Sequence, residues 1–185
     1  MKILQTKIKA MIKIIQENNA KENEILRADC VAIKQKEFGS AELLELIKKM
    51  KQATRQDPDG VALAAPQIAI NKRIFVVDPE RGYTVDAKWR PEVFINPEIV
   101  KTSNKMELKH EGCLSVRGIY GDTWRAINVT VQAYDENGNK FSFGAGGLTA
   151  HIIQHEIDHL DGILFIDHGL NLEDDPNWRE HWDKK

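Results

Sequence analysis

The chain has 185 residues, of which 42% are hydrophobic, and this is enough for one substantial core and a single globular domain. Its 26 basic and 28 acidic side chains give a formal net charge of -2, which excludes the basic excess expected of a protein whose main partner is DNA or another nucleic acid. Two cysteines, Cys30 and Cys113, are too few and too far apart for a disulfide framework and favour the cytoplasm, and no apolar run approaches the roughly 20 residues of a membrane span, so we expect no stable membrane association.

Residues 1–24 predict an amphipathic N-terminal extension. Apolar side chains recur there at helical spacing, namely Ile8, Met11, Ile12 and Ile15. Lysines interrupt each apolar run and exclude a secretory signal, at Lys7, Lys9 and Lys13. Such a helix most often packs on its own domain, and the alternative is contact with a membrane surface or an anionic partner such as ribosomal RNA. The pattern assigns it no function.

Residues 40–57 predict the next helix, with Ser40 as its N-cap and an apolar stripe along one face. The stripe consists of Leu43, Leu44, Ile47 and Met50. Further along, β-branched runs predict strands at residues 73–79 and 92–100. Residues 126–143 predict two more strands, joined by the turn sequence ENGN. Together these patterns indicate a mostly antiparallel sheet.

Residues 148–160 predict a central helix, because they lack strand alternation and stop at an Asp-Gly pair. This segment contains the pattern HExxH, in which His155 and His159 flank Glu156. At about 100° per residue, both histidines fall in one narrow apolar arc with Ile152. Their rings are therefore expected to point toward the core.

Two imidazoles on one buried helix face predict a metal site, since neutral imidazole is the commonest metal ligand. Glu156 projects beside the ligands, where a carboxylate can accept a proton from a bound water. His151 is rotated by about 60° from the pair on an ideal helix, so it is left out of the site. The other histidines have no comparable spacing and are assigned no role: His110, His168 and His181.

A third ligand completes this site in three alternative ways. Cys113 follows a glycine and the strand-like residues 105–110, so a thiolate is presented from a sheet edge. Glu173 lies fourteen residues after His159, which suits a zinc peptidase of the HExxH type. If Cys30 joins Cys113, four protein ligands form a closed, structural zinc site without enzymatic activity. The spacing alone leaves these alternatives open.

Three motifs in order resemble the peptide deformylases, whose signatures are GxGLAAPQ, EGCLS and QHExDHL. Here they read GVALAAPQ at 60–67, EGCLS at 111–115 and QHEIDHL at 154–160. An isolated HExxH is weak support, whereas three motifs in the family's order argue against coincidence. The resemblance divides the chain into an N-terminal extension, a catalytic domain and a C-terminal tail with room for a short helix, at residues 1–24, 25–168 and 169–185.

The resemblance implies an α+β fold in which antiparallel β-sheets surround the central helix that carries the HExxH motif. It also implies a hydrolase that removes the N-formyl group from the N-terminal formylmethionine of newly synthesised polypeptides and releases formate. The implied metal ligands are Cys113, His155 and His159. The implied metal is Fe²⁺, with Zn²⁺, Ni²⁺ or Co²⁺ as substitutes, and one thiolate with two imidazoles suits all of them.

The implied mechanism gives catalytic roles to Glu156, Gln67 and the backbone N–H of Leu114. A divalent metal lowers the pKa of its bound water, so that hydroxide attacks the formyl carbon after Glu156 has taken the proton. Gln67 and Leu114 then stabilise the developing oxyanion, and Glu156 returns the proton to the departing amine. An iron–thiolate site is also expected to lose activity in air.

The implied substrate pocket is lined by residues in and near the motifs: Gly60, Val61, Ala62, Glu111, Gly112, Tyr120 and Ile152. Within it, the resemblance implies that the methionine side chain lies near Val61, Leu114 and Ile152, with His151 as a further candidate. We expect Glu111 to pair with Arg125 and to steady the cysteine loop. Two positions depart from the family pattern. Ala62 replaces a glycine where backbone approaches substrate, and Arg117 replaces a proline, which predicts a less rigid loop through residues 118–120.

Some family members dock on the ribosome through a basic C-terminal helix. The C-terminal residues of this chain instead mix acidic groups with Trp178 and Trp182. The ribosome is therefore only weakly indicated as a partner beyond the nascent N-formylmethionyl peptide itself.

Overall fold

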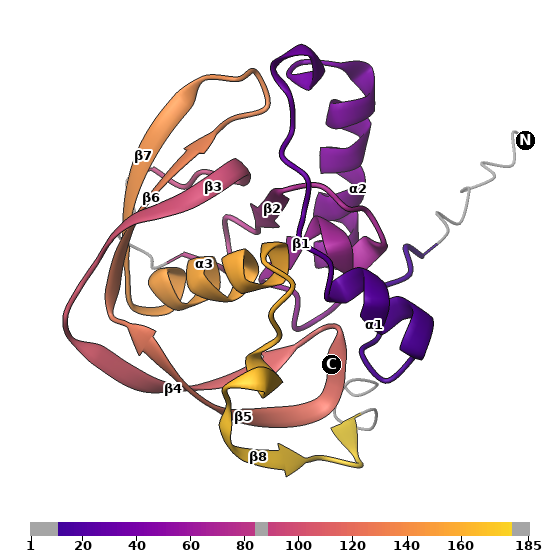
Figure 1. The fold of residues 1–185 in the computed structure, drawn as a ribbon, viewed down its shortest axis with the longest axis vertical. Helices are drawn as coiled ribbons and strands as arrows, with labels where there is room; N and C mark the ends of the chain where they lie inside the picture. Colours follow the sequence, from indigo (N-terminus) through magenta and orange to yellow (C-terminus); the bar gives the residue numbers. More distant parts are fainter. Residues whose placement is uncertain (1–10, 84–88, 179–185) are drawn as a thin grey trace, which may run out of the picture.

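The computed structural model describes residues 11–83 and 89–178, which form an α+β fold with two antiparallel sheets (Figure 1). The first sheet contains, in spatial order, β1 (Ala62–Ala64), β2 (Ile74–Val77), β3 (Val93–Thr102), β6 (Asn128–Tyr134) and β7 (Lys140–Gly146). The second contains β4 (Met106–Cys113), β5 (Val116–Ala126) and β8 (Leu170–Asp174). The helices are α1 (Ala20–Leu26), α2 (Ala41–Gln56) and α3 (Gly147–Leu160), with short 3-10 turns at Gln35–Glu37, Ala65–Ile68 and Phe165–Asp167. The predicted fold class is confirmed.

The helix α3 crosses the middle of the molecule and packs against strands of both sheets (Figure 1). Its inward side chains, including Ile153 and Leu160, join the main hydrophobic core with Phe75 and Phe94 of the first sheet. The helix ends as predicted, because Gly162 adopts a φ of 70°, a left-handed conformation that commonly stops helices. Packing on both sides holds the side chains of α3 in fixed positions. Among the described helices, none is long and apolar enough to span a bilayer.

The strand β1 separates two cores because successive strand residues face opposite sides. Ala62 and Ala64 face the core that contains α3, whereas Leu63 packs with Ile47 and Met50 of α2. The predicted α2 is confirmed, and its first turn is capped by the Ser40 hydroxyl, which accepts from the Leu43 N–H at 3.2 Å. The helix therefore supports the turn that follows β1.

The predicted hairpin is confirmed as β6 and β7, which pair without a shift in register. Its turn is stabilised by the Asp135 carboxylate, which accepts from the N–H groups of Asn137 at 2.9 Å and Asn139 at 2.8 Å. Gly138 has a φ of 84°, which the turn requires and which glycine adopts without steric cost. The strands predicted at residues 73–79 and 92–100 are confirmed as β2 and β3.

The N-terminal helix prediction is wrong for residues 11–16, which form no helix, while residues 8–10 lie outside the described part of the chain. Backbone N–H groups of this segment donate to partners outside it and not to carbonyls one helical turn earlier. For example, the N–H of Ile12 donates to the Gln56 side chain at 3.0 Å, and the N–H of Ile15 donates to the Gln67 carbonyl at 2.9 Å. Tertiary hydrogen bonds and the burial of Ile15 thus override the helical spacing.

Two further expectations concern the residues after Arg117 and the C-terminal tail, and the first of them is corrected. Residues 118–120 lie inside β5, so they do not form the less rigid loop that Arg117 predicted. The described part of the tail forms β8 over Leu170–Asp174, and the short helix for which the sequence left room stays a prediction. β8 pairs with β5, and the Gly118 carbonyl accepts from the Asp175 N–H at 2.6 Å, so the tail pairs with the segment that follows Arg117. Residues 179–185 lie outside the described chain.

Candidate metal centre and active site

Cys113 ends β4 at a tight turn into β5. The register of the two strands shifts after Gly112, so that Cys113 pairs with Val116. This turn brings N–H groups to the sulfur: the Ser115 backbone donates to Sγ at 3.4 Å and the Gln67 side chain at 3.6 Å. Both donors favour the thiolate form, which is the form that ligates metals.

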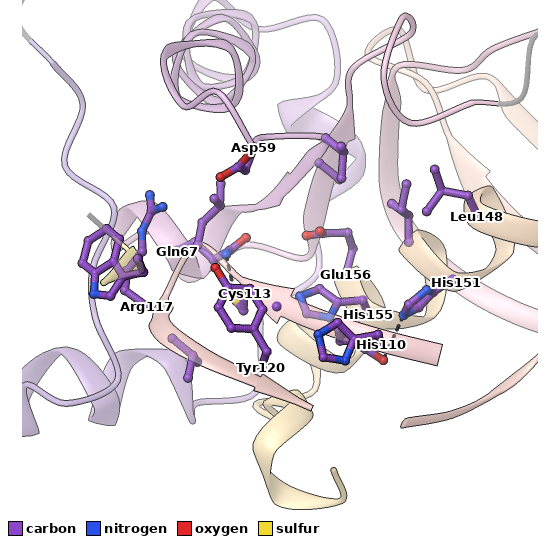
Figure 2. Close-up of a pocket in the computed structure, with 18 of the residues that line it drawn as sticks. Asp59, Gln67, His110, Cys113, Arg117, Tyr120, Leu148, His151, His155 and Glu156 are labelled. Atoms are coloured by element: carbon purple, nitrogen blue, oxygen red, sulfur yellow. Dashed lines mark hydrogen bonds and ion pairs between the residues drawn. The ribbon is translucent and has the colours of Figure 1, made fainter. Parts of the chain in front are cut away.

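The helix α3 brings His155 and His159 to the same place, one turn apart on its inner side. Nε2 of His159 lies 3.1 Å from the sulfur of Cys113, although the two residues are 46 positions apart in the chain. One ligand atom from each of the three residues lies within 4.8 Å of the others. The structure therefore brings together the three predicted ligands, from the end of β4 and the C-terminal half of α3. Figure 2 shows two of them, Cys113 and His155, facing the same pocket.

The carboxylate of Glu111, which is 4% exposed, orients His155. Its Oε2 accepts from Nδ1 of His155 at 2.6 Å, which leaves Nε2 of that ring for a metal. Its Oε1 accepts from Arg125 at 2.7 Å and contacts Nε2 of His151 at 3.0 Å. The predicted ion pair with Arg125 is confirmed. Burial alone would raise the pKa of Glu111, but the hydrogen bonds from these three side chains hold it far below its usual range.

The charges around the sulfur fit a divalent cation. Burial alone would raise the pKa of Cys113, but the neighbouring rings of His159 and His155 outweigh it and lower the pKa to about 5. Conversely, the thiolate and Glu111 raise the pKa of His155 well above its usual value despite burial. These anionic groups favour positive charge between the three ligands, which a metal supplies without protonating the rings. One thiolate and two imidazoles suit iron, zinc, cobalt or nickel.

Glu156 is the next residue after His155, and its side chain is also directed into this buried region. Burial raises the pKa of its carboxyl to about 7. Its Oε2 is buried and has no hydrogen-bond partner in the described part of the chain. A carboxyl group with a pKa near neutrality and an unpaired oxygen is suited to accept and return a proton.

Gln67 lies in the 3-10 turn Ala65–Ile68 that follows β1, and only 1% of it is exposed. Its side-chain oxygen accepts from the Ala64 N–H at 2.8 Å. The amide nitrogen consequently points the other way, toward the cysteine turn, where it donates to the Ser115 hydroxyl at 3.3 Å. The residue is thus both a satisfied core amide and a donor directed at the site. Leu114 occupies the turn opposite, and its carbonyl accepts from Gln16 at 2.9 Å.

Comparison with known proteins agrees with this geometry. The family model described as Polypeptide deformylase matches residues 10–175. This chain belongs to the peptide deformylase family. The match extends beyond both ends of the catalytic domain predicted at residues 25–168. Peptide deformylase 1 of Clostridium perfringens is 42% identical over 149 residues, which cover 80% of this chain and 94% of that protein. The peptide deformylase of Syntrophomonas wolfei is 43% identical over 148 residues, which cover 80% of this chain and 89% of that protein.

Solved deformylase structures share the fold. A peptide deformylase from Synechococcus elongatus in complex with actinonin superposes with a TM-score of 0.76 at 37% identity, covering 89% of this chain and 83% of that one. A Met-Ala-Ser bound class I type b enzyme from Acinetobacter baumannii gives 0.74 at 32% identity, covering 86% and 100%. The present chain is accordingly a metal-dependent amidohydrolase that removes the N-formyl group from nascent polypeptides, and Cys113, His155 and His159 form its metal site.

The deformylase pocket opens beside the metal ligands as a cavity of about 290 Å³ (Figure 2). Most of the predicted substrate residues line it: Val61, Ala62, Glu111, Gly112, Tyr120 and Ile152. Gly60 does not, because it is buried behind the pocket wall, where a Cβ atom would lie 2.0 Å from the Thr54 carbonyl oxygen. Gly60 therefore allows the chain to pass close to α2 and makes no contact with the cavity.

Leu114 and His151, which were expected near the methionine pocket, also line the cavity. The sequence analysis missed five further lining residues: Asp59, His110, Arg117, Leu148 and Trp178. The rotation that excludes His151 from the metal arc directs it toward Glu111 instead. Leu148 was detectable, since it shares the apolar arc of the two histidine ligands. Arg117 pairs with the buried Asp57 and lies over the ring of Trp178, 5.4 Å from its centroid. No sequence signal connects these three positions.

The alternative ligands lie elsewhere in the described chain. Cys30 packs against the main core, its N–H donates to the Leu160 carbonyl at 2.9 Å, and burial raises its pKa to about 11. Glu173 is exposed on β8, opposite Tyr120 in the register with β5. Neither belongs to the metal site, so residues 11–83 and 89–178 supply no fourth protein ligand of the kind that a closed zinc site needs. His181 lies outside the described residues.

Proposed function

We propose that this deformylase acts on the N-terminal formylmethionine of nascent polypeptides through proton transfer by Glu156, with Gln67 and the backbone N–H of Leu114 as oxyanion donors. The observation that carries the proposal is the buried Glu156 carboxylate, whose Oε2 lacks a partner among the described residues beside the metal ligands. The chemistry that a divalent cation supplies at these ligands is a lowered pKa of water, and hence a nucleophile near neutral pH.

In this mechanism Glu156 carries one proton from the attacking water to the departing amine. Glu156 accepts a proton from the attacking water, whose oxygen bonds to the formyl carbon. The formyl oxygen becomes negative and is met by the Gln67 amide, which Ala64 holds in its orientation, and by the N–H of Leu114. As the carbon–nitrogen bond breaks, Glu156 returns the proton to the amine. Formate and a free amino terminus are the products.

The variant Glu156→Gln tests this proposal because it keeps the size of the side chain and removes the base. We expect kcat for formate release from formyl-Met-Ala-Ser to fall by about 10²- to 10⁴-fold, with the metal content unchanged. The measurement is made without oxygen on protein of known metal content. Glu98→Gln, an exposed position on β3, is the matched control and is expected to keep full activity. Full turnover by Glu156→Gln contradicts the proposal.

For the metal, we propose Fe²⁺ as the working ion, with Zn²⁺, Ni²⁺ or Co²⁺ as substitutes. The set of one thiolate and two imidazoles supports this group of metals. We expect protein loaded with Fe²⁺ to lose activity in air, because both the ion and the thiolate are oxidised. Zinc-loaded protein provides the control, since zinc has no redox chemistry. An iron-loaded sample that keeps full activity under oxygen contradicts the proposal.

Because the substrate is a chain still being synthesised, we place the reaction in the cytoplasm and regard N-formylmethionyl peptides as the partners. We also propose that residues 25–168 form the catalytic domain. Within it, we assign substrate contacts to Val61, Ala62 and Ile152. Docking on the ribosome has little support, since the described tail contributes a strand and acidic residues in place of a basic helix.

A further inference from the structure

Residues 15–17 run between the two turns that carry the proposed oxyanion donors. The N–H of Ile15 donates to the Gln67 carbonyl at 2.9 Å, and the N–H of Glu17 donates to the Ser115 carbonyl at 2.8 Å. In an extended segment, residues two apart face the same side. One edge of this short segment therefore binds the glutamine turn and the cysteine turn together.

Gln16 adds a bond to the cysteine turn and faces a second anchor on its other side. Its side-chain nitrogen donates to the Leu114 carbonyl at 2.9 Å. Its backbone N–H donates to Oε2 of Glu22 at 2.7 Å, and Glu22 also pairs with Lys13. Since Glu22 belongs to α1, that helix holds the segment from outside while the two turns hold it from inside.

The two residues whose carbonyl groups bind this segment, Gln67 and Ser115, also direct N–H groups at the sulfur of Cys113. The Gln67 amide donates to the Cys113 sulfur at 3.6 Å, and the Ser115 N–H donates to the same atom at 3.4 Å. Two oxyanion donors must meet a single oxygen at about 3 Å, so their separation matters as much as their presence. The burial of Ile15, which is 4% exposed, fixes the segment that spans them.

We propose that residues 15–17 form a positioning strap, which sets the spacing between the Gln67 amide and the Leu114 N–H. The inference rests on the oxyanion roles proposed above. It gives a function to part of the N-terminal extension, to which the sequence pattern assigned none. Gln16 is the residue through which the strap is tested, because its contact with Leu114 is made by a side chain.

The variant Gln16→Leu removes the donor to Leu114 and keeps a side chain of similar size. We expect kcat to fall about tenfold, with KM and metal content unchanged, because misplacement of catalytic groups slows the chemical step. Gln16→Glu places a carboxylate against the Leu114 carbonyl and is expected to lose at least as much. Glu24→Ala, an exposed position on α1, is the matched control. Thermal unfolding confirms that each variant is folded at the assay temperature.

A double-mutant cycle with Gln67→Leu separates positioning from general stability. Because the strap acts on the separation of two donors, removing one of them is expected to shrink the effect of Gln16→Leu to less than about threefold. Gln16→Leu with unchanged kcat, or with the same tenfold loss in the Gln67→Leu background, overturns the strap alone. Unchanged kcat in Gln67→Leu overturns the oxyanion role of Gln67 and the strap with it.

Discussion

At the scale of single residues, Arg125 neutralises two carboxylates at the back of the metal site. It bonds to Glu111 at 2.7 Å and to Asp158 of α3 at 2.6 Å, and its side chain is 7% exposed. Glu111 in turn holds the ligand His155. A buried carboxylate is tolerated only while its cationic partner remains, so the orientation of the ligand depends on Arg125.

Replacement of this cation tests the dependence. We expect Arg125→Met to lower the free energy of unfolding by about 3–5 kcal/mol, because it removes the guanidinium that pairs with both Glu111 and Asp158 in a buried place. Lys48→Met is the control, since the pair of Lys48 with Glu45 is exposed and contributes at most about 1 kcal/mol. Denaturant unfolding of the metal-free proteins measures both changes. A loss below 1 kcal/mol in Arg125→Met would show that Glu111 does not need this partner.

The sequence predicted the site residues whose directions depend on neighbours in the chain, and it missed contacts that depend on distant residues. His155, Glu156 and His159 were predictable because the direction of each side chain depends on local helical geometry. The bond between His151 and Glu111 was not, because its partner lies on β4, brought to α3 only by the complete fold. The cysteine ligand became distinct from its alternatives through the family motif, since spacing alone left three candidates.

At the scale of secondary-structure elements, the C-terminal end of α3 is fixed by a close approach of two chain segments. Gly162 has a φ of 70°, and a Cβ atom on it would lie 2.4 Å from the carbonyl oxygen of Arg27, just after α1. The N–H of Cys30 also donates to the carbonyl of Leu160, at 2.9 Å. The segment after α1 therefore covers the end of the helix that bears the metal ligands.

This close contact at Gly162 predicts that alanine substitution has different effects on stability at two glycines. Gly162→Ala is expected to lower the free energy of unfolding by about 2–5 kcal/mol, because it combines an unfavourable φ with a backbone collision. Gly144→Ala on β7 is expected to be neutral or slightly stabilising, since no atom lies within 4 Å of its Cβ position. Thermal and denaturant unfolding of the two variants give the comparison. Equal stabilities would contradict the close packing at residue 162.

Elements with local determinants were predicted well, and elements with distant partners were not. The cap at Ser40 and the turn around Gly138 reside in short stretches of sequence, so α2 and the β6–β7 hairpin were found. Residues 11–16 have a helical pattern, but their polar groups are satisfied by Gln56 and Gln67. β8 likewise exists because β5 offers it an edge, which the tail sequence does not encode.

For the whole molecule, the arrangement of the cores decides whether the metal is structural or catalytic. α3 lies in a core formed with the first sheet, and α2 closes a second core on the opposite side of β1 and β2. Both consist of apolar side chains and neither depends on the metal ligands. The second sheet adds Cys113 at the edge of this assembly. We therefore expect the apolar packing to keep the protein folded before a cation binds.

Removal of the metal provides the corresponding test. We expect the chelated protein to lose activity, yet to keep its far-ultraviolet circular dichroism and unfold cooperatively at a lower Tm. Adding Zn²⁺ at 100 times its Kd should restore about 2.7 kcal/mol of stability, because the cation binds only the folded state. Cys113→Ala, which lacks the thiolate, should show a much smaller response to Zn²⁺. A structural zinc protein behaves differently, since chelation unfolds it. Loss of secondary structure on chelation would therefore favour that alternative, whereas a folded apoprotein agrees with a site built for catalysis.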